Sequence, residues 1–448
     1  MNKKTGFLLV AVLLFTLIGS SCTSDDTANK SAGGLKIYYL DADRNISSAL
    51  DIFGSKFKDT KIDAKMFSSA QMEEYKNQFT VSMLSGDGPD IISVNPLITS
   101  SIRKLMQNGV FCDLNKLIEE DHEFSLSDYN EKAMEAGVYK EKRYLLTVMY
   151  RLDTFASSKG MLDQCNVSLG GSDWTWKQLA GQVEKFSGKN ADMPKYFFDE
   201  RFKMSKVIEN SGDYFVDFNN KTARFDSKEF IALLNIYKDI YPAICTPEDA
   251  ARYNTVQIKD FVGSGLILTS SFFSLGSPGS LYDVNSTYKN ERNEDVNITP
   301  FPLLEGQKGI VSLPFQLVGI NNKCKDKKSA FEFLKILLSE ELQRNVDSSG
   351  NPVKSLSFVP VNKKAYEKDL EFYSDAGVNT YYENGTAIPG ELGEYMDSII
   401  NSVDKCIIFD NNISLMIDEE AAGFLKGEKT AEQAAGDLQR KVTLYLNE

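Results

Sequence analysis

The sequence predicts an α/β protein built as two lobes, with an export leader in front of them. Short apolar strands alternate with amphipathic helices over residues 35–94, which is typical of a parallel sheet covered on both faces. Residues 35–448 are too many for one small domain and fit two lobes. A basic and then apolar segment, followed by a polar stretch, precedes the first strand.

The N-terminal segment has the pattern of an export signal. Two lysines are followed by an apolar run, residues 7–18, which is shorter than the about 20 residues that a transmembrane helix needs. The small residues 19–21 precede Cys22, and this arrangement resembles the bacterial lipobox, in which the cysteine receives a lipid. We expect residues 1–21 to be a signal peptide and Cys22 to be lipidated, with palmitate among its acyl chains. The alternative is a freely secreted protein with an incidental cysteine.

The stretch after Cys22 is expected to connect the lipid anchor to the folded part of the protein without packing against its core. Residues 22–34 are small and polar, so they are expected to form a flexible tether. The protein would then sit on the extracytoplasmic face of the cell membrane, held by its lipid. The whole chain has a net charge of −13, which disfavours nucleic acid and anionic headgroups as partners.

The first strands and helices follow one another closely. A strand is predicted at residues 35–40, and residues 46–57 place apolar side chains on one face of a helix. A second strand at 61–67 leads to a helix over 72–85, which Gly86 is placed to end. A third short apolar strand at 90–94 completes the pattern.

Further along, the pattern predicts a turn and a short helix within residues 105–120, then three more strands, three longer helices and a mostly helical C-terminal part. The helix over 176–186 has the clearest start, because Thr175 and Gln178 form a capping box and Trp174 and Leu179 a hydrophobic staple. The strands are expected at residues 144–152, 266–269 and 315–320, and the other helices at 230–241 and after Asp326.

Seven segments in order resemble motifs of one protein family. Residues 85–95 (SGDGPDIISVN) resemble its Gly-x-Gly-Pro-Asp motif before a strand, and residues 144–153 (YLLTVMYRLD) its Tyr-Gly-Leu-Pro and Tyr-Asn-x-Asp stretch. Residues 329–343 (SAFEFLKILLSEELQ) resemble its Ala-x-x-Phe-x-Lys-x-Leu helix. The others are LNKLIEED at 114–121, TWKQL at 175–179, FVGSGLILTSSF at 261–272 and FVPVN at 358–362. On these motifs the chain resembles the family 1 extracellular solute-binding proteins, whose maltose-type members bind sugars.

The resemblance implies a periplasmic-binding-protein-like fold of type II, with two α/β lobes, a cleft, and hinge strands that cross between the lobes. Lobe 1 would comprise residues 35–148 and 270–314, and lobe 2 residues 149–269 and 315–448. The crossings are expected near Val148, Thr269 and Phe315. The resemblance also implies a monomer that captures a carbohydrate, closes over it and delivers it to ABC permease subunits.

A sugar presents an apolar ring face and a belt of hydroxyls, so its site needs an aromatic plate and fixed hydrogen-bonding groups. Phe272 and Phe273 follow a predicted crossing strand, and one of them is a candidate plate unless both pack in the core. Tyr150 offers a ring and a hydroxyl at the lobe junction, or packs in the hinge. Arg151 and Asp153 are polar at the same place, where the alternative is a surface ion pair.

Polar side chains also stand at the ends of the other strands, where ligands bind in open parallel sheets. Asp41 and Asp43 follow the first strand, and Asn95 follows the third. Gln316 lies in a predicted crossing strand. The alternative for Asp43 is capping of the following helix.

The chain lacks the patterns of common catalytic and metal sites. Its one histidine, His122, lies in an acidic loop, so a Ser–His triad or an HExxH zinc site has too few histidines. The loop after the first strand begins like a calcium-binding loop, but Ile46 and Ile52 occupy the positions of its glycine and glutamate. The five cysteines after Cys22 include no CxxC pair. We expect these side chains to be buried, and the alternative is one disulfide between two of them. We expect no enzyme, cofactor or metal.

Three hypotheses follow. The chain is the binding subunit of an importer, a surface-lipoprotein glycosidase, or a sensory solute-binding lipoprotein. Catalytic assays separate the second from the others, and a neighbouring permease gene separates the first from the third.

Overall fold

The computed structural model describes residues 34–99, 101–186, 196–247, 268–271, 296–344, 359–374 and 390–448. Contacts divide the chain into two units, Met1–Gly33 and Gly34–Glu448. The predicted leader, the tether up to residue 33 and Cys22 therefore lie outside the described residues. Among the described residues, no helix is both long and apolar enough to cross a bilayer.

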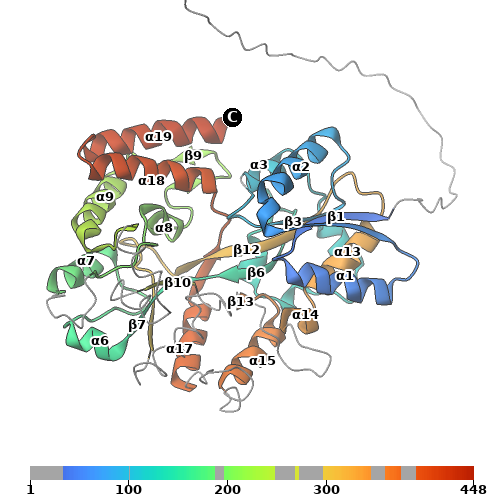
Figure 1. Cartoon of the computed structure of the whole chain (residues 1–448), viewed down its shortest axis with the longest axis horizontal. Helices are drawn as coiled ribbons and strands as arrows, with labels where there is room; N and C mark the ends of the chain where they lie inside the picture. The colour runs from blue at the N-terminus through green and yellow to red at the C-terminus, as the bar shows by residue number, and fades with distance from the viewer. Residues whose placement is uncertain are drawn as a thin grey trace, which may run out of the picture. The chain divides into compact units, whose positions relative to one another are not determined.

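The largest sheet has seven strands in the order β13-β6-β12-β3-β1-β2, with β14 added beside β12 (Figure 1). The first three strands are parallel to one another, as the alternation of strands and helices predicts. They are β1 (Leu35–Leu40), β2 (Ile62–Phe67) and β3 (Ile91–Val94). The others are β6 (Leu146–Arg151), β12 (Ile310–Ile320), β13 (Val359–Pro360) and β14 (Val403–Cys406).

Strand β12 is longer than the strand predicted at 315–320. Its last residues pair antiparallel with β3, while its first residues pair with β14 and its middle with β6. The first half of the strand was not predicted because Pro314 has no N–H to donate to a neighbouring strand, which argues against a central strand. The register of β12 against β6 shifts next to Pro314, which is the Cα partner of Tyr150. All of β12 except Phe315 is buried, so the strand joins distant parts of the sheet through the core.

A second sheet has three antiparallel strands, with β7 between β10 and β11. These are β7 (Asp153–Ser158), β10 (Leu268–Ser271) and β11 (Val296–Pro300). Only Leu152 separates β6 from β7, so the chain passes directly from one sheet to the other. Phe155 of β7 packs in an aromatic core, with its ring 4.3 Å from that of Phe301.

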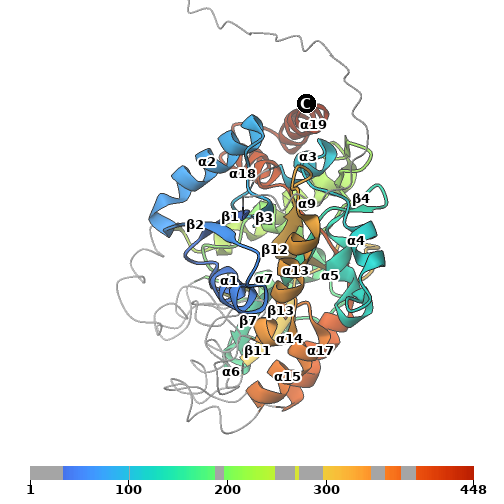
Figure 2. The same cartoon turned by 90° about the vertical axis from the view of Figure 1, so that its right-hand side faces the viewer.

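The helices cover these sheets in separate groups. Around the seven-stranded sheet are α1 (Arg44–Lys56), α2 (Met72–Ser85), α3 (Ile102–Gln107), α5 (Glu131–Glu135) and α13 (Lys327–Leu337). In Figures 1 and 2, α13 lies beside α1, which it contacts. Near β7 lie α6 (Lys159–Gln164), α7 (Trp176–Lys185) and α9 (Lys228–Ile240). Helix α18 (Asn411–Leu425) packs between α8 (Met204–Glu209) and α19 (Ala431–Asn447), contacting both.

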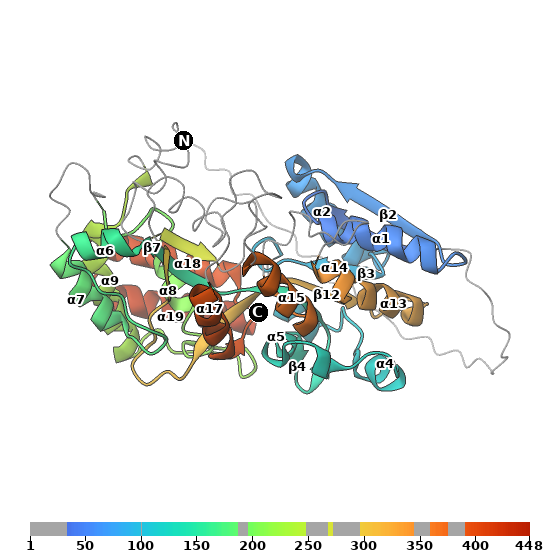
Figure 3. The ribbon, with the colours of Figure 1, turned by 90° about the horizontal axis from the view of Figure 1, so that it is seen from below.

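Two helices form a further layer beside β13. Helices α15 (Lys363–Ser374) and α17 (Gly390–Asn401) contact each other. They lie below β12 and β6 in Figure 1 and below β12 in Figure 2, whereas α2 and α3 lie above these strands. Figure 3 shows the same pair from below. Helix α15 also packs on α14 (Glu340–Arg344).

The pairings join segments that the predicted division assigns to different lobes. Strand β11 was expected in lobe 1 but pairs with β7, and α13 was expected in lobe 2 but packs on α1. The physical reason is the path of the chain. It leaves the larger sheet at Leu152, forms the smaller sheet, and returns to the larger sheet in β12, which pairs with β3. Of the strand predicted at 266–269, residues 268 and 269 belong to β10, and residues 266 and 267 lie outside the described residues.

Local signals in the sequence are confirmed. Thr175 and Gln178 form the capping box of α7, and Gly86 ends α2 with a φ of 81°. The Asp326 side chain accepts a hydrogen bond from the Ser329 N–H at the start of α13. The five cysteines after Cys22 are buried, and none of these described residues forms a disulfide.

Candidate functional site

Polar side chains from three distant segments meet at the carboxyl edge of β1 and β3. Asp41 and Asp43 follow β1, and Asn95 follows β3. Gln316 precedes Leu317, whose Cα partner in β3 is Val94, so Gln316 reaches the same edge from the antiparallel strand. The structure thus places four of the predicted residues at or beside the adjoining ends of β1, β3 and β12.

Gln316 ties this edge together. Its amide Nε2 donates to Ser93 Oγ at 3.0 Å, and its Oε1 accepts from Asn45 Nδ2. Gln316 is 3% exposed, and Asn45 lies in the first turn of α1. Sequence reasoning did not select Ser93 or Asn45 as binding residues. The signal for Ser93 is a hydroxyl inside the otherwise apolar strand Ile91–Val94.

The two aspartates after β1 are held in different ways. Asp41 Oδ1 accepts from the Ser69 N–H at 2.9 Å, which links the ends of β1 and β2. Asp43 is the N-cap residue of α1, but its side chain makes no capping bond and instead accepts from the Leu40 N–H at 3.2 Å. Burial raises the pKa of Asp43 to about 6, and the negative charge of Asp41 adds to this rise.

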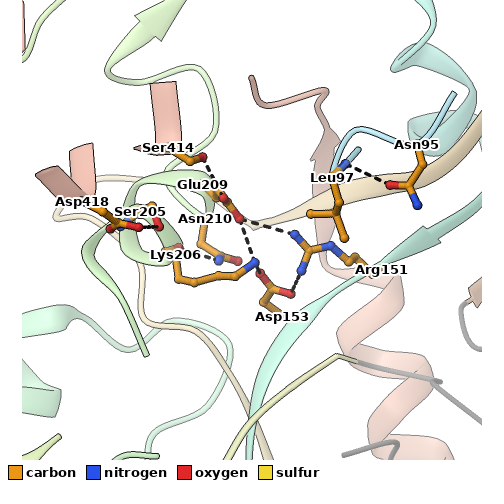
Figure 4. A network of polar contacts seen from close by, with 10 residues as sticks. All are labelled: Asn95, Leu97, Arg151, Asp153, Ser205, Lys206, Glu209, Asn210, Ser414 and Asp418. Atoms are coloured by element: carbon orange, nitrogen blue, oxygen red, sulfur yellow. Dashed lines mark hydrogen bonds and ion pairs between the residues drawn. The ribbon is translucent and has the colours of Figure 1, made fainter. Parts of the chain in front are cut away.

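Asn95 closes a tight turn after β3. Its Oδ1 accepts from the Leu97 N–H at 2.9 Å (Figure 4). Its Nδ2 donates to no acceptor in the described part of the chain. The amide is therefore fixed by its oxygen and has donor hydrogens left for a ligand.

Arg151 and Asp153 belong to a buried ion network at the passage between the sheets (Figure 4). Arg151 pairs with Asp153 and, at 3.4 Å, with Glu209, while Lys206 Nζ lies 2.9 Å from Glu209 and 3.3 Å from Asp153. Ser414 Oγ donates to Glu209 at 2.9 Å. The side chains of Arg151 and Asp153 are 8% and 2% exposed, so the alternative of a surface ion pair is corrected to a buried network. Sequence reasoning missed Glu209 and Lys206, because no local sequence pattern indicates that α8 lies beside β7.

Tyr150 lies apart from the other predicted residues. The Cα partner of Tyr150 in β12 is Pro314, whereas that of Met149 is Gln316, and the register shifts between these two pairs. Its ring is 1% exposed, its hydroxyl accepts from Asn130 Nδ2 at 3.1 Å, and burial raises its pKa well above the ordinary value. It lines a cavity of about 560 Å³ beside α15 and α17.

The predicted aromatic plates Phe272 and Phe273 lie outside the described residues. The two tryptophans are buried, and Trp174 Nε1 donates to the Pro300 carbonyl at 2.8 Å, so Trp174 has a structural role beside β11. In the described part of the chain, no group of three or more His, Cys, Asp or Glu side chains is placed to hold a metal ion.

The sequence profile of the family described as bacterial extracellular solute-binding protein matches residues 49–380. The chain belongs to this family. Its members are binding receptors rather than enzymes. A search of curated protein sequences finds no match to this solute-binding protein.

Solved structures show the same fold along nearly the whole length of this solute-binding protein. The sugar-binding protein MalE from Xanthomonas citri matches with a TM-score of 0.67 and 11% identity, covering 93% of this chain and 98% of that one. An ABC substrate-binding protein from Listeria monocytogenes, in complex with cycloalternan, matches at 0.63 and 17%, covering 92% and 99%. The GacH receptor of Streptomyces glaucescens, studied unliganded and with acarbose, matches at 0.63 and 15%, covering 93% and 99%.

Proposed function

We propose that this solute-binding protein is the ligand-capturing subunit of an ABC importer and that its ligand is a sugar or oligosaccharide. The observation that carries the proposal is the edge at which Asp41, Asp43, Asn95 and Gln316 meet. Structural neighbours described as binding sugar, cycloalternan or acarbose support the ligand class.

The chemistry of this edge fits a ring of hydroxyl groups. Carboxylates accept strong charge-assisted hydrogen bonds from hydroxyls, and Asp41 and Asp43 supply two of them. The free Nδ2 hydrogens of Asn95 would donate to a hydroxyl oxygen, and Phe272 or Phe273 would cover the apolar ring face. Arg151 and Asp153 would support the site by fixing the passage from β6 to β7, with no direct contact to the sugar.

We propose that the lobes are built around the two sheets, with the cleft between them. This division follows the pairings, so the end of β12 and α13 go with the N-terminal strands, and β11 goes with β7. The passages at Leu152 and through β12 would serve as hinges for closure over the ligand. Closure would create the surface that docks on the permease.

The proposal includes a lipid anchor at Cys22, which would hold the protein on the extracytoplasmic face of the membrane. Replacing this thiol by Cys22→Ser should abolish metabolic labelling with a palmitate analogue and move the protein from the detergent phase to the aqueous phase. A labelled Cys22→Ser protein would contradict the anchor and leave the binding function untouched.

The experiment for the ligand uses protein that lacks residues 1–22, which keeps the compact unit Gly34–Glu448 whole. Its thermal unfolding is recorded with a panel of mono- and oligosaccharides. A ligand at 100 times its Kd stabilises by about 2.7 kcal/mol, which raises the Tm of a protein of this size by roughly 2 °C or more.

A selective rise with one sugar, recovered unchanged, would support the proposal and identify the ligand. The absence of any rise would overturn the carbohydrate assignment. Cleavage of the sugar would favour the glycosidase hypothesis instead.

A further inference from the structure

The cavity beside Tyr150 is separate from the carboxyl edge of β1 and β3. It has a volume of about 560 Å³, and neither Gln316 nor the polar residues that follow β1 and β3 line it. Its walls come from β6, β13, α15, α17 and the residue that starts α5. This volume lies within the range of about 300–1,000 Å³ that small-molecule sites occupy.

Asn130 fixes the direction of a buried hydroxyl in this cavity. As the N-cap of α5, its Oδ1 accepts from the Ala133 N–H at 3.0 Å, so its Nδ2 must be the atom that donates to Tyr150 Oη. The Tyr150 oxygen is therefore an acceptor in that contact, and its own hydrogen points elsewhere. None of the described residues accepts this hydrogen. A donor buried to this degree needs a partner, and the cavity is where one fits.

The charges around the cavity are unbalanced. Glu367 and Glu371 are four residues apart on α15, and neither has a hydrogen-bond or ion-pair partner among the described residues. Both side chains are exposed, and two like charges at this spacing on a helix repel each other. Asp397 accepts from Tyr366 Oη and Asn401 Nδ2, at 3.3 and 3.1 Å. Among the described residues of the lining, the one lysine, Lys363, donates to the Ser127 carbonyl at 2.9 Å.

The arrangement favours an organic cation over a metal ion. No three His, Cys, Asp or Glu side chains in the described ranges converge on a point where a metal could bind. Pro360, Val361 and Ile400 give the cavity an apolar wall. A ligand that fits has an ammonium group, a partly apolar body and an oxygen that accepts a hydrogen bond.

We propose that this cavity is a second binding site, for a small organic cation that carries a hydroxyl or carbonyl oxygen, such as an amino sugar. Its ammonium group binds between Glu367 and Glu371, and its oxygen accepts the hydrogen of Tyr150 Oη. The site is independent of the sugar proposed for the edge at Gln316.

The test is calorimetric titration of the protein lacking residues 1–22 with glucosamine, N-acetylglucosamine and glucose. Only glucosamine carries the positive charge, so we expect saturable binding of glucosamine that is at least tenfold tighter than that of the other two, and that weakens with salt. Equal affinity for all three sugars, or no saturable binding of glucosamine, would overturn the proposal.

Variants place the binding in this cavity rather than at the other edge. The double change Glu367→Gln and Glu371→Gln should weaken glucosamine binding at least tenfold. The matched control is Glu391→Gln with Glu394→Gln, which removes two exposed charges from α17 outside the cavity and should leave binding unchanged. If both double variants weakened glucosamine binding equally, the result would contradict the proposed site.

Tyr150→Phe removes only the hydroxyl and should weaken glucosamine binding about fivefold, the worth of one hydrogen bond. Circular dichroism checks that this variant is folded. Unchanged affinity in folded Tyr150→Phe protein would show that the hydroxyl does not contact the ligand and would contradict the proposed binding mode.

Discussion

At the carboxyl edge of β1 and β3, the side chains of Asn95 and Asp43 keep bonding capacity that no described residue uses, whereas the side chains at the passage from β6 to β7 bind one another. Asn95 has no acceptor for its Nδ2 hydrogens in the described part of the chain, and Asp43 accepts one hydrogen bond. Arg151, by contrast, contacts both Asp153 and Glu209, and Lys206 bridges the same two acids.

This contrast distinguishes residues that bind a ligand from residues that stabilise the fold, although both kinds are polar residues at strand ends in the sequence. A polar group whose partners lie in the protein holds the fold, and removing one partner leaves a buried charge. A fixed polar group with free hydrogens or lone pairs is ready for a ligand. Changes at the passage should therefore act on unfolding, and changes at the edge should act on affinity.

The largest effect is expected for Arg151→Ala. It leaves Asp153 and Glu209 buried with reduced compensation, which should lower the free energy of unfolding by about 3–5 kcal/mol. Urea unfolding measures this loss. A loss below about 1 kcal/mol would mean that the network does not hold the passage together.

A smaller loss of stability and a clear loss of affinity are expected for Gln316→Met. The change keeps the volume but leaves Asn45 and Ser93 without their partner, which should cost about 1–3 kcal/mol of stability. Affinity for the sugar found in the panel should fall about tenfold, because the edge is no longer fixed. Unchanged affinity in a folded variant would remove Gln316 from the site.

The raised pKa of Asp43 predicts a pH effect at the edge. The folded state holds the Asp43 proton more firmly than the unfolded chain, so this group favours folding below about pH 4 and loses that contribution as the pH rises through about 6. The unfolding free energy of Asp43→Asn relative to wild type should therefore increase between pH 4.5 and 7. Parallel curves for the two proteins in urea unfolding would contradict the burial of this carboxyl.

The smallest effect is expected for a solvent-exposed ion pair of α4 (Asn115–Glu120), between Lys116 and Glu120. Their side chains are 83% and 50% exposed, so Lys116→Ala should change the unfolding free energy by less than about 0.5 kcal/mol. This variant is the matched control for Arg151→Ala in the same urea series. A loss similar to that of Arg151→Ala would mean that burial does not decide the difference.

The sequence predicts the parts of the fold that depend on local pattern. The strand at Leu35–Leu40, the capping box at Thr175 and the end of α2 at Gly86 follow from periodicity and from the backbone preferences of single residues. Family motifs supply the fold class, which the solved structures confirm. The N-terminal half of β12 was missed because Pro314 interrupts the local signal, although pairing on both sides restores the strand.

The candidate site is less accessible to sequence reasoning because it depends on contacts between distant segments. Asp41, Asp43 and Asn95 could be found, since each follows a recognisable strand. Tyr150 and Arg151 are neighbours in β6 and point to opposite faces, but which residues of β12 lie beside them could not be known before the pairing of β6 and β12 was known. Glu209 joins Arg151 through tertiary packing alone, 58 residues further along the chain.

Hydrogen exchange with and without the sugar found in the panel tests the central claim most directly. If the sugar binds where Asp41, Asn95 and Gln316 meet, exchange should slow at residues 41–46, 95–99 and 314–318 and stay unchanged in α15. Slowing confined to α15 and α17, with no change at the edge, would contradict the account and place the sugar in the cavity beside Tyr150.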